Sequence, residues 1–311
     1  MKPNIIVLID IGTYSTRMLI VAVHSDRRFD EIFSVGRITA LGRKLKETGY
    51  LQKEAMEETL AVLKEYLQIA KQYKPTKIVA VATQACREAK NAQDFISKVK
   101  QLGIDVRVIS GEEEAKLSFL ATSKALNIDD KFTVIDQGGG STEFSYGEKS
   151  NLIHSISFPF GIVNLTEKFI KSDPPKPEEI DQMKEFLKSQ IEKAYERMKD
   201  TQILVGLGGT ITTVAASEYN IYPYDSKKIH GAKLSYQTIT KWLNKLASMT
   251  VNQRKAIPTI EDKRAEAIVS GIVIFQTAME VFQKEEITIS EWGVRHGLLL
   301  EIIQDQHKLS L

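Results

Sequence analysis

Two short stretches of the sequence place glycine, hydroxyl residues and charged residues in the same order. Residues 9–17 read IDIGTYSTR, and residues 135–143 read IDQGGGSTE. Glycine lets a backbone approach a ligand closely, and successive backbone N–H groups in a tight turn form a concavity that binds anions. Because hydroxyl groups can add further donors to such a turn, both stretches predict phosphate binding. The phosphate ligands predicted on the two turns are Gly12, Thr13, Ser15, Gly138, Gly139, Gly140, Ser141 and Thr142.

The similarity of the two stretches extends to their surroundings. Each follows a buried apolar run and precedes a second run with strand character, so each reads as a strand, a tight glycine turn and a returning strand. Chance resemblance is the alternative, but the identical residues fall at turn-forming and hydroxyl-bearing positions. A duplication predicts two α/β domains that face each other across a cleft and contribute one glycine hairpin each.

A third glycine turn, GLGGT at residues 206–210, follows a strand-like run and opens a helix. A helix N-terminus is itself an anion site, so Gly208, Gly209 and Thr210 are also predicted to bind phosphate. Other phosphate-binding motifs fit less well. The sequence has no G-x-x-x-x-G-K-[ST], and GGGSTE lacks the third glycine of G-x-G-x-x-G and precedes a strand, where that motif opens a helix.

Acids flank the second glycine turn. Asp136 ends a predicted strand and Glu143 lies on the returning strand, so both carboxylates can face the mouth of the hairpin. Mg²⁺ prefers oxygen ligands and is commonly held by one or two carboxylates together with substrate phosphates and water, which makes this pair a candidate magnesium site. The alternative is that Asp136 only caps the turn and Glu143 is a surface residue.

Three further acids, Glu112, Glu113 and Glu114, begin a predicted helix. A carboxylate there could act as a general base, but the helix dipole favours acids in a first turn without any catalytic role. Spacing alone does not choose among the three. Arg87 follows a buried strand, at the edge where α/β active sites form, although most arginines are simply solvated.

Strands and helices alternate along the chain, which is typical of an α/β protein. Strands are predicted at 5–9, 17–23, 29–38, 77–82, 104–109, 132–136, 142–147, 152–158, 202–206 and 286–290. Helices are predicted at 53–72, 92–102, 112–126, 161–171, 178–198, 236–248, 261–282 and 294–305. The predicted domains are residues 1–124 and 125–311, with a C-terminal helix over about 294–311 that could pack back on the first domain.

The composition is that of an ordinary globular protein, with 311 residues, 42% hydrophobic and 26% charged, and a net charge of +2. This balance favours neither a nucleic-acid partner nor a membrane surface, and no run of about 18 apolar residues predicts a membrane span. The single cysteine, Cys86, excludes an intrachain disulfide and is interpreted as a small buried residue. We expect a cytoplasmic protein, and the sequence leaves a homodimer open.

Five stretches occur in the order found in one known family, namely IDIGTYSTR, ATQACREAKN, VISGEEEA, IDQGGGSTE and VGLGGTITT. They resemble the exopolyphosphatase/guanosine pentaphosphate phosphohydrolase (Ppx/GppA) family in its short two-domain form, within the superfamily of acetate and sugar kinases, Hsp70 and actin. The resemblance covers essentially the whole chain. It implies an α/β fold of two actin-like (ribonuclease H-like) domains with an interdomain cleft. Longer members carry an extra C-terminal helical region, so a preference for long polyphosphate chains is not implied.

The resemblance also implies an activity. The family hydrolyses the terminal phosphoanhydride bond of inorganic polyphosphate, or removes the 5′ γ-phosphate of pppGpp to give ppGpp. It uses a divalent ion, usually Mg²⁺. The expected partners are therefore polyphosphate or guanosine phosphates.

The same resemblance implies roles for individual residues. Glu114 is the base that activates water, and Arg87 lies beside the reacting phosphate. The metal ligands that it implies are Asp136, Glu143 and Asp10. The arginines that match those associated with guanosine phosphates are Arg17 and Arg264.

Two other functions would use the same features. A stringent-response sensor would bind guanosine phosphates in the cleft with little turnover. A kinase or an Hsp70-like ATPase would need an acceptor pocket or a peptide-binding domain, and the sequence indicates neither.

Overall fold

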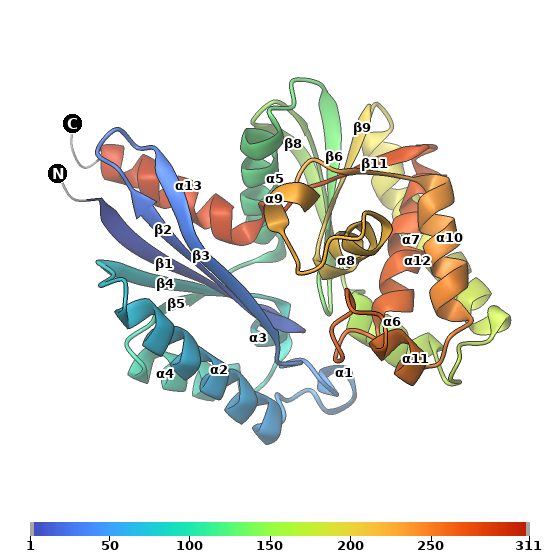
Figure 1. Cartoon of the computed structure of the whole chain (residues 1–311), viewed down its shortest axis with the longest axis horizontal. Helices are drawn as coiled ribbons and strands as arrows, with labels where there is room; N and C mark the ends of the chain where they lie inside the picture. Colours follow the sequence, from blue (N-terminus) through green and yellow to red (C-terminus); the bar gives the residue numbers. More distant parts are fainter. Residues whose placement is uncertain (1–2, 309–311) are drawn as a thin grey trace. The chain divides into compact units, whose positions relative to one another are not determined.

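In a computed structural model of the protein, which describes residues 3–308 and side chains as far as residue 305, the chain forms two compact units. The first unit contains the residues up to 117 together with those from 294 on, and the second contains residues 118–293. Each unit has one β-sheet with helices on both of its faces (Figure 1). The glycine turns lie at the ends of strands in these sheets.

The sheet of the first unit has the strand order β3-β2-β1-β4-β5. Its strands are β1 (Asn4–Ile11), β2 (Ser15–Val23), β3 (Phe29–Ile38), β4 (Lys77–Ala82) and β5 (Asp105–Val108). β1, β4 and β5 are parallel, whereas β2 is antiparallel to both of its neighbours. The helices that contribute to this unit are α1 (Leu45–Thr48), α2 (Lys53–Lys71), α3 (Gln84–Glu88), α4 (Ala92–Gln101), α5 (Gly111–Leu126) and α13 (Val294–Lys308).

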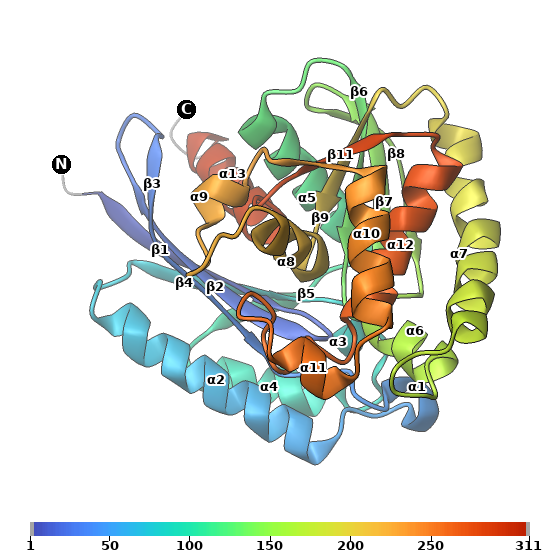
Figure 2. The same cartoon turned by 45° about the vertical axis from the view of Figure 1, so that its right-hand side comes forward.

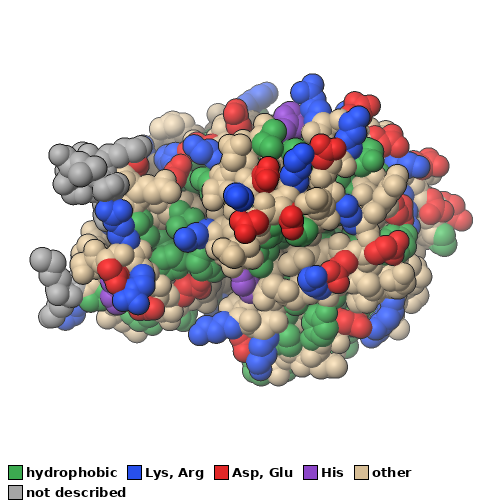
Figure 3. All heavy atoms as spheres, turned by 90° about the horizontal axis from the view of Figure 1, so that it is seen from above, with side chains coloured by type: hydrophobic (Ala, Val, Ile, Leu, Met, Phe, Trp, Pro, Cys, Tyr) green, Lys and Arg blue, Asp and Glu red, His purple; other side chains and the backbone are tan. Residues whose placement is uncertain are grey.

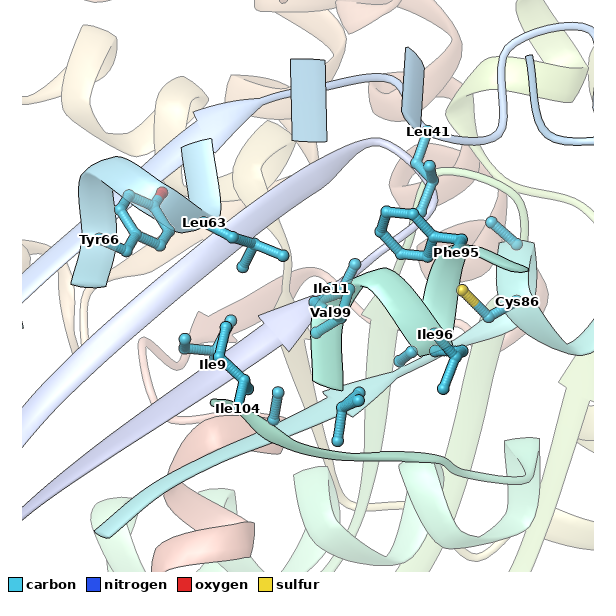
Figure 4. Close-up of a cluster of buried hydrophobic side chains, with 14 of the residues drawn as sticks. Ile9, Ile11, Leu41, Leu63, Tyr66, Cys86, Phe95, Ile96, Val99 and Ile104 are labelled. Carbon is cyan, nitrogen blue, oxygen red and sulfur yellow. The ribbon is translucent and has the colours of Figure 1, made fainter. Parts of the chain in front are cut away.

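The central strands of the first unit are apolar on both faces because helices cover both faces. On one face, Ile9 and Ile11 of β1 pack with Leu63 of α2 and Phe95 of α4 (Figure 4). On the other face, Leu8 packs with apolar residues of α13 and with the start of α5. Burial of these side chains is the main stabilising term, and it fixes where the strands end.

The sheet of the second unit has the order β10-β11-β9-β6-β7-β8. Its strands are β6 (Lys131–Gln137), β7 (Thr142–Glu148), β8 (Asn151–Phe158), β9 (Ile203–Leu207), β10 (Lys233–Ser235) and β11 (Glu286–Ile289). Its further helices are α6 (Ile162–Phe169), α7 (Pro177–Met198), α8 (Gly209–Glu218), α9 (Ser226–Ile229), α10 (Tyr236–Ala247), α11 (Val251–Lys255) and α12 (Ile268–Val281). The buried helix α12 lies between α7 and α10 (Figure 2). On the opposite face of the sheet, Phe119 of α5 stacks on Phe132 of β6 with ring centroids 4.6 Å apart.

The two sheets repeat one arrangement. The order β8-β7-β6-β9-β11 has the same parallel and antiparallel pairings as β3-β2-β1-β4-β5, and β10 is an addition. The N–H of Gly12 donates to the carbonyl of Ser15 at 3.0 Å, and the N–H of Gly138 donates to that of Ser141 at 3.0 Å. A Cβ added to Gly12 would lie 2.8 Å from the carbonyl oxygen of Ser15, and one added to Gly138 would lie 2.9 Å from that of Ser141. Both turns therefore require glycine there. The predicted α/β fold of two actin-like domains is confirmed, while the cleft between them stays a prediction.

Some elements differ from the sequence prediction. The predicted helix at 261–282 begins only at Ile268, and residues 261–267 form turns. The units divide after residue 117 and not after 124, because α5 carries Leu117 in the core of the first unit and Phe119 in the core of the second. Helix α13 belongs to the first unit, and residues 309–311 of the predicted C-terminal helix lie outside the described residues. The elements that were not predicted are α1, α3, α9, α11 and β10.

The surface carries charges of both signs. Figure 3 shows acidic and basic side chains interspersed over the face that it displays, in keeping with a net charge of +2. Within residues 3–308, no helix is both long enough and apolar enough to cross a membrane.

Tyr66 links α2 to the strand that leaves the first glycine turn. Its buried hydroxyl donates to the carbonyl of Thr16 at 2.8 Å. Tyr66→Phe keeps the ring but removes the donor of a buried carbonyl, so we expect the free energy of unfolding to fall by about 1–2 kcal/mol. Urea denaturation measures this change, with Tyr50→Phe as the control because Tyr50 is exposed. Equal losses in the two variants would contradict this role of the Tyr66 hydroxyl.

Candidate functional site

In the first unit, the carboxyl ends of three parallel strands bring the predicted catalytic residues to one edge of the sheet. Ile11 of β1 pairs with Ala82 of β4, and Ala82 pairs with Val108 of β5. The segments that follow are the first glycine turn, helix α3 and the start of α5. Ligands of α/β proteins bind at this edge.

Arg87 and Glu114 form a partly buried ion pair at this edge. The Nη1 of Arg87 lies 2.7 Å from Oε2 of Glu114 and also donates to the carbonyl of Ile109 at 2.9 Å. Glu114 is 8% exposed. By contrast, Glu112 is exposed and Glu113 pairs with Arg107. The structure thus distinguishes three acids that spacing alone could not.

The first glycine turn is held by its own hydroxyl and carbonyl groups. The hydroxyl of Thr13 donates to Oε1 of Gln84 at 2.9 Å and accepts from the N–H of Ala85 at 3.1 Å. The carbonyl of Thr13 accepts from Gly42 at 2.9 Å. The Thr13 hydroxyl, predicted as a phosphate ligand, is therefore engaged in fixing the turn to the start of α3. Gln84, which does the same, was not predicted from the sequence.

The carbonyls of the second glycine turn all face the start of α6. Those of Gly138 and Gly139 accept from the N–H groups of Ile162 and Val163 at 3.2 and 2.7 Å, and that of Gly140 accepts from Asn164 at 2.9 Å. In a planar trans peptide, the carbonyl and the following N–H point in opposite directions. The N–H groups of residues 139, 140 and 141 consequently point away from α6, where they can donate to an anion.

The hydroxyl of Thr142, also predicted as a phosphate ligand, has a structural partner. It donates to the carbonyl of Phe160 at 2.8 Å and is fully buried. In this turn, as in the first, one threonine hydroxyl ties the turn to the neighbouring segment. The backbone N–H groups and Ser141 remain as the groups suited to a ligand.

The two carboxylates predicted to hold metal lie directly opposite each other. Asp136 of β6 pairs in register with Glu143 of β7, so both side chains are on the face of the sheet that α5 covers. Ser118 donates to Oδ2 of Asp136 at 2.5 Å, and Ser157 donates to Oε1 of Glu143 at 2.7 Å. Glu143 is only 1% exposed. Two like charges facing each other destabilise a sheet, and a bound cation would remove that cost.

The donor set fits a hard divalent cation. Two carboxylates with neighbouring hydroxyl oxygens match the preference of Mg²⁺, which takes its remaining ligands from water and substrate phosphates. Among the side chains described, no group of three or more His, Cys, Asp or Glu could hold a metal ion. Asp10, the third predicted ligand, lies in the first unit directly opposite Arg17. Arg17, the residue opposite Asp10 on the neighbouring strand, therefore has the opposite charge. The role of Asp10 as a metal ligand stays a prediction.

The third glycine turn lies beside Arg264. The guanidinium of Arg264 occupies the space in which a side chain at Gly209 would lie, at the N-terminus of α8. Arg264 is 7% exposed, and its Nη2 lies 3.0 Å from Glu261. A cation next to the positive end of a helix is favourable only where negative charge is present. The hydroxyl of Thr210 lies against Gly271 of α12, and the positive end of α8 and the Arg264 guanidinium lie together at this turn.

A second buried arginine fixes the turns at 261–267. Arg254 donates from Nε to the carbonyl of Leu246 at 2.8 Å and from Nη1 to that of Ala265 at 3.0 Å. Burial lowers the pKa of its guanidinium below the ordinary value, although it remains a cation at neutral pH. Arg254 thus holds the segment that carries Arg264.

Several residues of the site gave no signal in the sequence. Ser118, Ser157 and Asn164 are single polar residues within helices or strands, far from the residues that they contact. Only the fold brings them to the predicted motifs. The prediction that Cys86 is a buried structural residue agrees with its position, since burial raises the pKa of its thiol to about 12.

Several known proteins are similar to this chain in sequence. The model of the Ppx/GppA phosphatase family matches residues 19–306. Exopolyphosphatase 2 of Mycobacterium tuberculosis is 31% identical, over 94% of this chain and 97% of that protein. A bifunctional 3-dehydroquinate synthase/phosphatase of Fusobacterium nucleatum is 32% identical over 96% of this chain, which spans 46% of that longer protein.

A solved structure extends the similarity to the fold. The crystal structure of the Ppx/GppA family member of Aquifex aeolicus has a TM-score of 0.83 and 43% sequence identity, over 97% of this chain and 98% of that chain. The match thus takes in both units. The family inferred from the five sequence stretches is confirmed, and the chain belongs to the Ppx/GppA phosphatase family.

Proposed function

We propose that the protein hydrolyses terminal phosphoanhydride bonds, releasing orthophosphate from inorganic polyphosphate or the 5′ γ-phosphate of pppGpp to give ppGpp. The observation that carries the proposal is the partly buried Arg87–Glu114 pair, which lies at the sheet edge that also holds the first glycine turn. Membership of a phosphatase family supports the reaction class. The exopolyphosphatase of Mycobacterium tuberculosis, similar over nearly its whole length, supports polyphosphate as a substrate.

Glu114 is the proposed general base. In the reaction, a water oxygen forms a bond to the terminal phosphorus, the bridging P–O bond breaks, and its electron pair stays on the leaving phosphate. The proton of the water passes to the Glu114 carboxylate. The ion pair with Arg87 holds the Glu114 carboxylate in a fixed position at this edge of the sheet.

The glycine turns are the proposed phosphate sites, and Asp136 with Glu143 the proposed metal site. The N–H groups of residues 139–141 would bind phosphate oxygens, beside the two carboxylates that would hold Mg²⁺. When bound, Mg²⁺ supplies positive charge that neutralises the phosphates. Ser118 and Ser157 orient the two carboxylates through their hydrogen bonds.

Arg264 at the N-terminus of α8 is the feature that supports a guanosine phosphate ligand. Two sources of positive charge meet there, and the ion-pair partner of Arg264, Glu261, has a side chain that is 59% exposed. Arg17, the other arginine assigned to guanosine phosphates, lies across the strands from Asp10. A sensor that binds guanosine phosphates with little turnover is the second candidate function, because this anion site does not require catalysis.

Glu114→Gln tests the base directly. Glutamine keeps the shape and still accepts a hydrogen bond from Arg87, but it cannot take up the proton, so we expect kcat for phosphate release to fall by about 10²–10⁴-fold. Release from polyphosphate and from pppGpp is measured with a colorimetric phosphate assay. The matched control is Glu113→Gln, one residue away and paired with Arg107. Undiminished activity of Glu114→Gln would exclude Glu114 as the base.

Asp136→Asn and Glu143→Gln test the metal site. Each removes one negative charge from the facing pair, so we expect affinity for Mn²⁺, used as a spectroscopic substitute for Mg²⁺, to fall beyond detection. We expect Ser157→Ala, which removes a hydrogen bond to one carboxylate, to weaken it by about 10–100-fold. Electron paramagnetic resonance of free Mn²⁺ measures binding without substrate. Asp200→Asn, an exposed residue of the same unit, is the control, and unchanged affinity in both carboxylate variants would contradict the site.

A side-by-side assay separates hydrolase from sensor. Phosphate release from polyphosphate and pppGpp at saturating Mg²⁺ is compared with ppGpp binding by calorimetry. Arg264→Met should weaken ppGpp binding by about 10–100-fold, because it removes charge-assisted hydrogen bonds, while exposed Lys255→Met should not. Tight ppGpp binding without phosphate release from either substrate would favour the sensor over the enzyme.

A further inference from the structure

Asn164 contacts the second glycine turn from the first turn of α6. Its Nδ2 donates to the carbonyl of Gly140 at 2.9 Å and to that of Pro159 at 3.2 Å, and its Oδ1 accepts from the N–H of Gly161 at 2.7 Å. Only this orientation of the amide satisfies its partners, because two of them are acceptors and the third is a donor. The side chain is therefore fixed in one orientation by three groups.

The duplication provides an internal comparison for this contact. Tyr14 occupies the position in the first turn that Gly140 occupies in the second, and its carbonyl accepts from the backbone N–H groups of Thr39 and Ala40 at 3.0 and 2.8 Å. In both units a donor thus binds the carbonyl at the equivalent position of the turn. In the first unit the donors are backbone groups, whereas in the second the donor is the Asn164 side chain, which a substitution can remove.

The carbonyl of Gly140 sets the direction of the N–H of Ser141, because both belong to one planar peptide. Asn164 holds that carbonyl on the α6 side, together with the carbonyls of the two preceding glycines. Without its donor, this peptide can rotate, since glycine tolerates most backbone conformations. The turn would then present two ordered N–H groups to a ligand where it now presents three.

We propose that Asn164 is a positioning residue for phosphate binding, which fixes the Gly140–Ser141 peptide so that the Ser141 N–H points at a phosphate group of the substrate. The inference rests on the proposed function, because it concerns how residues 138–141 bind a phosphoanhydride. Asn164 acts through the turn and does not itself touch the ligand. The chemistry recognised is a phosphate group with several anionic oxygens, as at the end of a polyphosphate chain.

A purely structural role for Asn164 would be to cap α6. Its Oδ1 accepts the N–H of Gly161 as one half of a capping interaction, which stabilises a helix N-terminus. Capping uses Oδ1, whereas positioning uses Nδ2. Asn164→Asp therefore keeps the cap and removes the donor, so the two roles can be separated.

Calorimetric titration with pyrophosphate tests the proposal on the full-length protein. We expect Asn164→Ala and Asn164→Asp each to bind pyrophosphate about tenfold more weakly than the wild type, because one charge-assisted hydrogen bond is lost. Thr166→Val is the matched control on the same helix. Its hydroxyl bonds the carbonyl of Ile162 and lies 2.7 Å from Ser270, without touching the turn, so affinity should stay within about twofold.

A comparison of the two variants and one further measurement keep the outcome unambiguous. The new carboxylate of Asn164→Asp could repel the ligand, but Asn164→Ala adds no charge, so a loss due to disorder of the turn should appear in both variants. Amide signals of residues 139–141 in TROSY spectra should shift with pyrophosphate in the wild type, and less for Ser141 in Asn164→Asp. If both Asn164 variants bind as tightly as Thr166→Val, the positioning role is wrong. If the wild-type amide signals do not shift at all, the phosphate site itself is contradicted, and with it the proposed function.

Discussion

The opposite directions of C=O and N–H in a trans peptide are the constraint on which both glycine turns depend. A turn can offer its N–H groups to an anion only if something else binds its carbonyls. In the second unit the start of α6 does so, and in the first unit the segment at 39–42 does so. The elements behind each turn therefore matter as much as the glycines themselves.

The duplicated hairpins diverged most clearly at one paired position. In the first unit Asp10 faces Arg17, and in the second Asp136 faces Glu143 at the equivalent place in the strands. The first pair is neutral, whereas the second concentrates two negative charges on a buried surface with serine hydroxyls as donors. A change of residue type at this position thus replaces a pair of opposite charges by a pair of like charges, which supports the proposed cation site.

Much of the fold followed from the sequence because its strands are short apolar runs with clear boundaries. Strands β3 and β4 match their predicted ranges, and the glycine turns were identified as a repeat. The turns at 261–267 were predicted as helix because residues 261–282 read as one continuous helical run. In the structure, a hydrogen bond from Arg254 holds residues 261–267 in turns. Asn164, Ser118 and Ser157 could not be found, because a lone polar residue acquires its role only from a partner distant in the chain. The choice of Glu114 came from the family resemblance, and its burial is consistent with that choice without testing its role.

The register that sets Asp136 opposite Glu143 also limits how the family can vary in length. Successive side chains of a strand point to opposite faces, so a one-residue shift in the register of β7 would turn Glu143 toward the face covered by α12. Connections at the surface, such as residues 170–176 between α6 and α7, have no such restriction. In evolution, insertions and deletions should therefore accumulate in such connections, while the hairpin from Asp136 to Glu143 is inherited as a unit of fixed length.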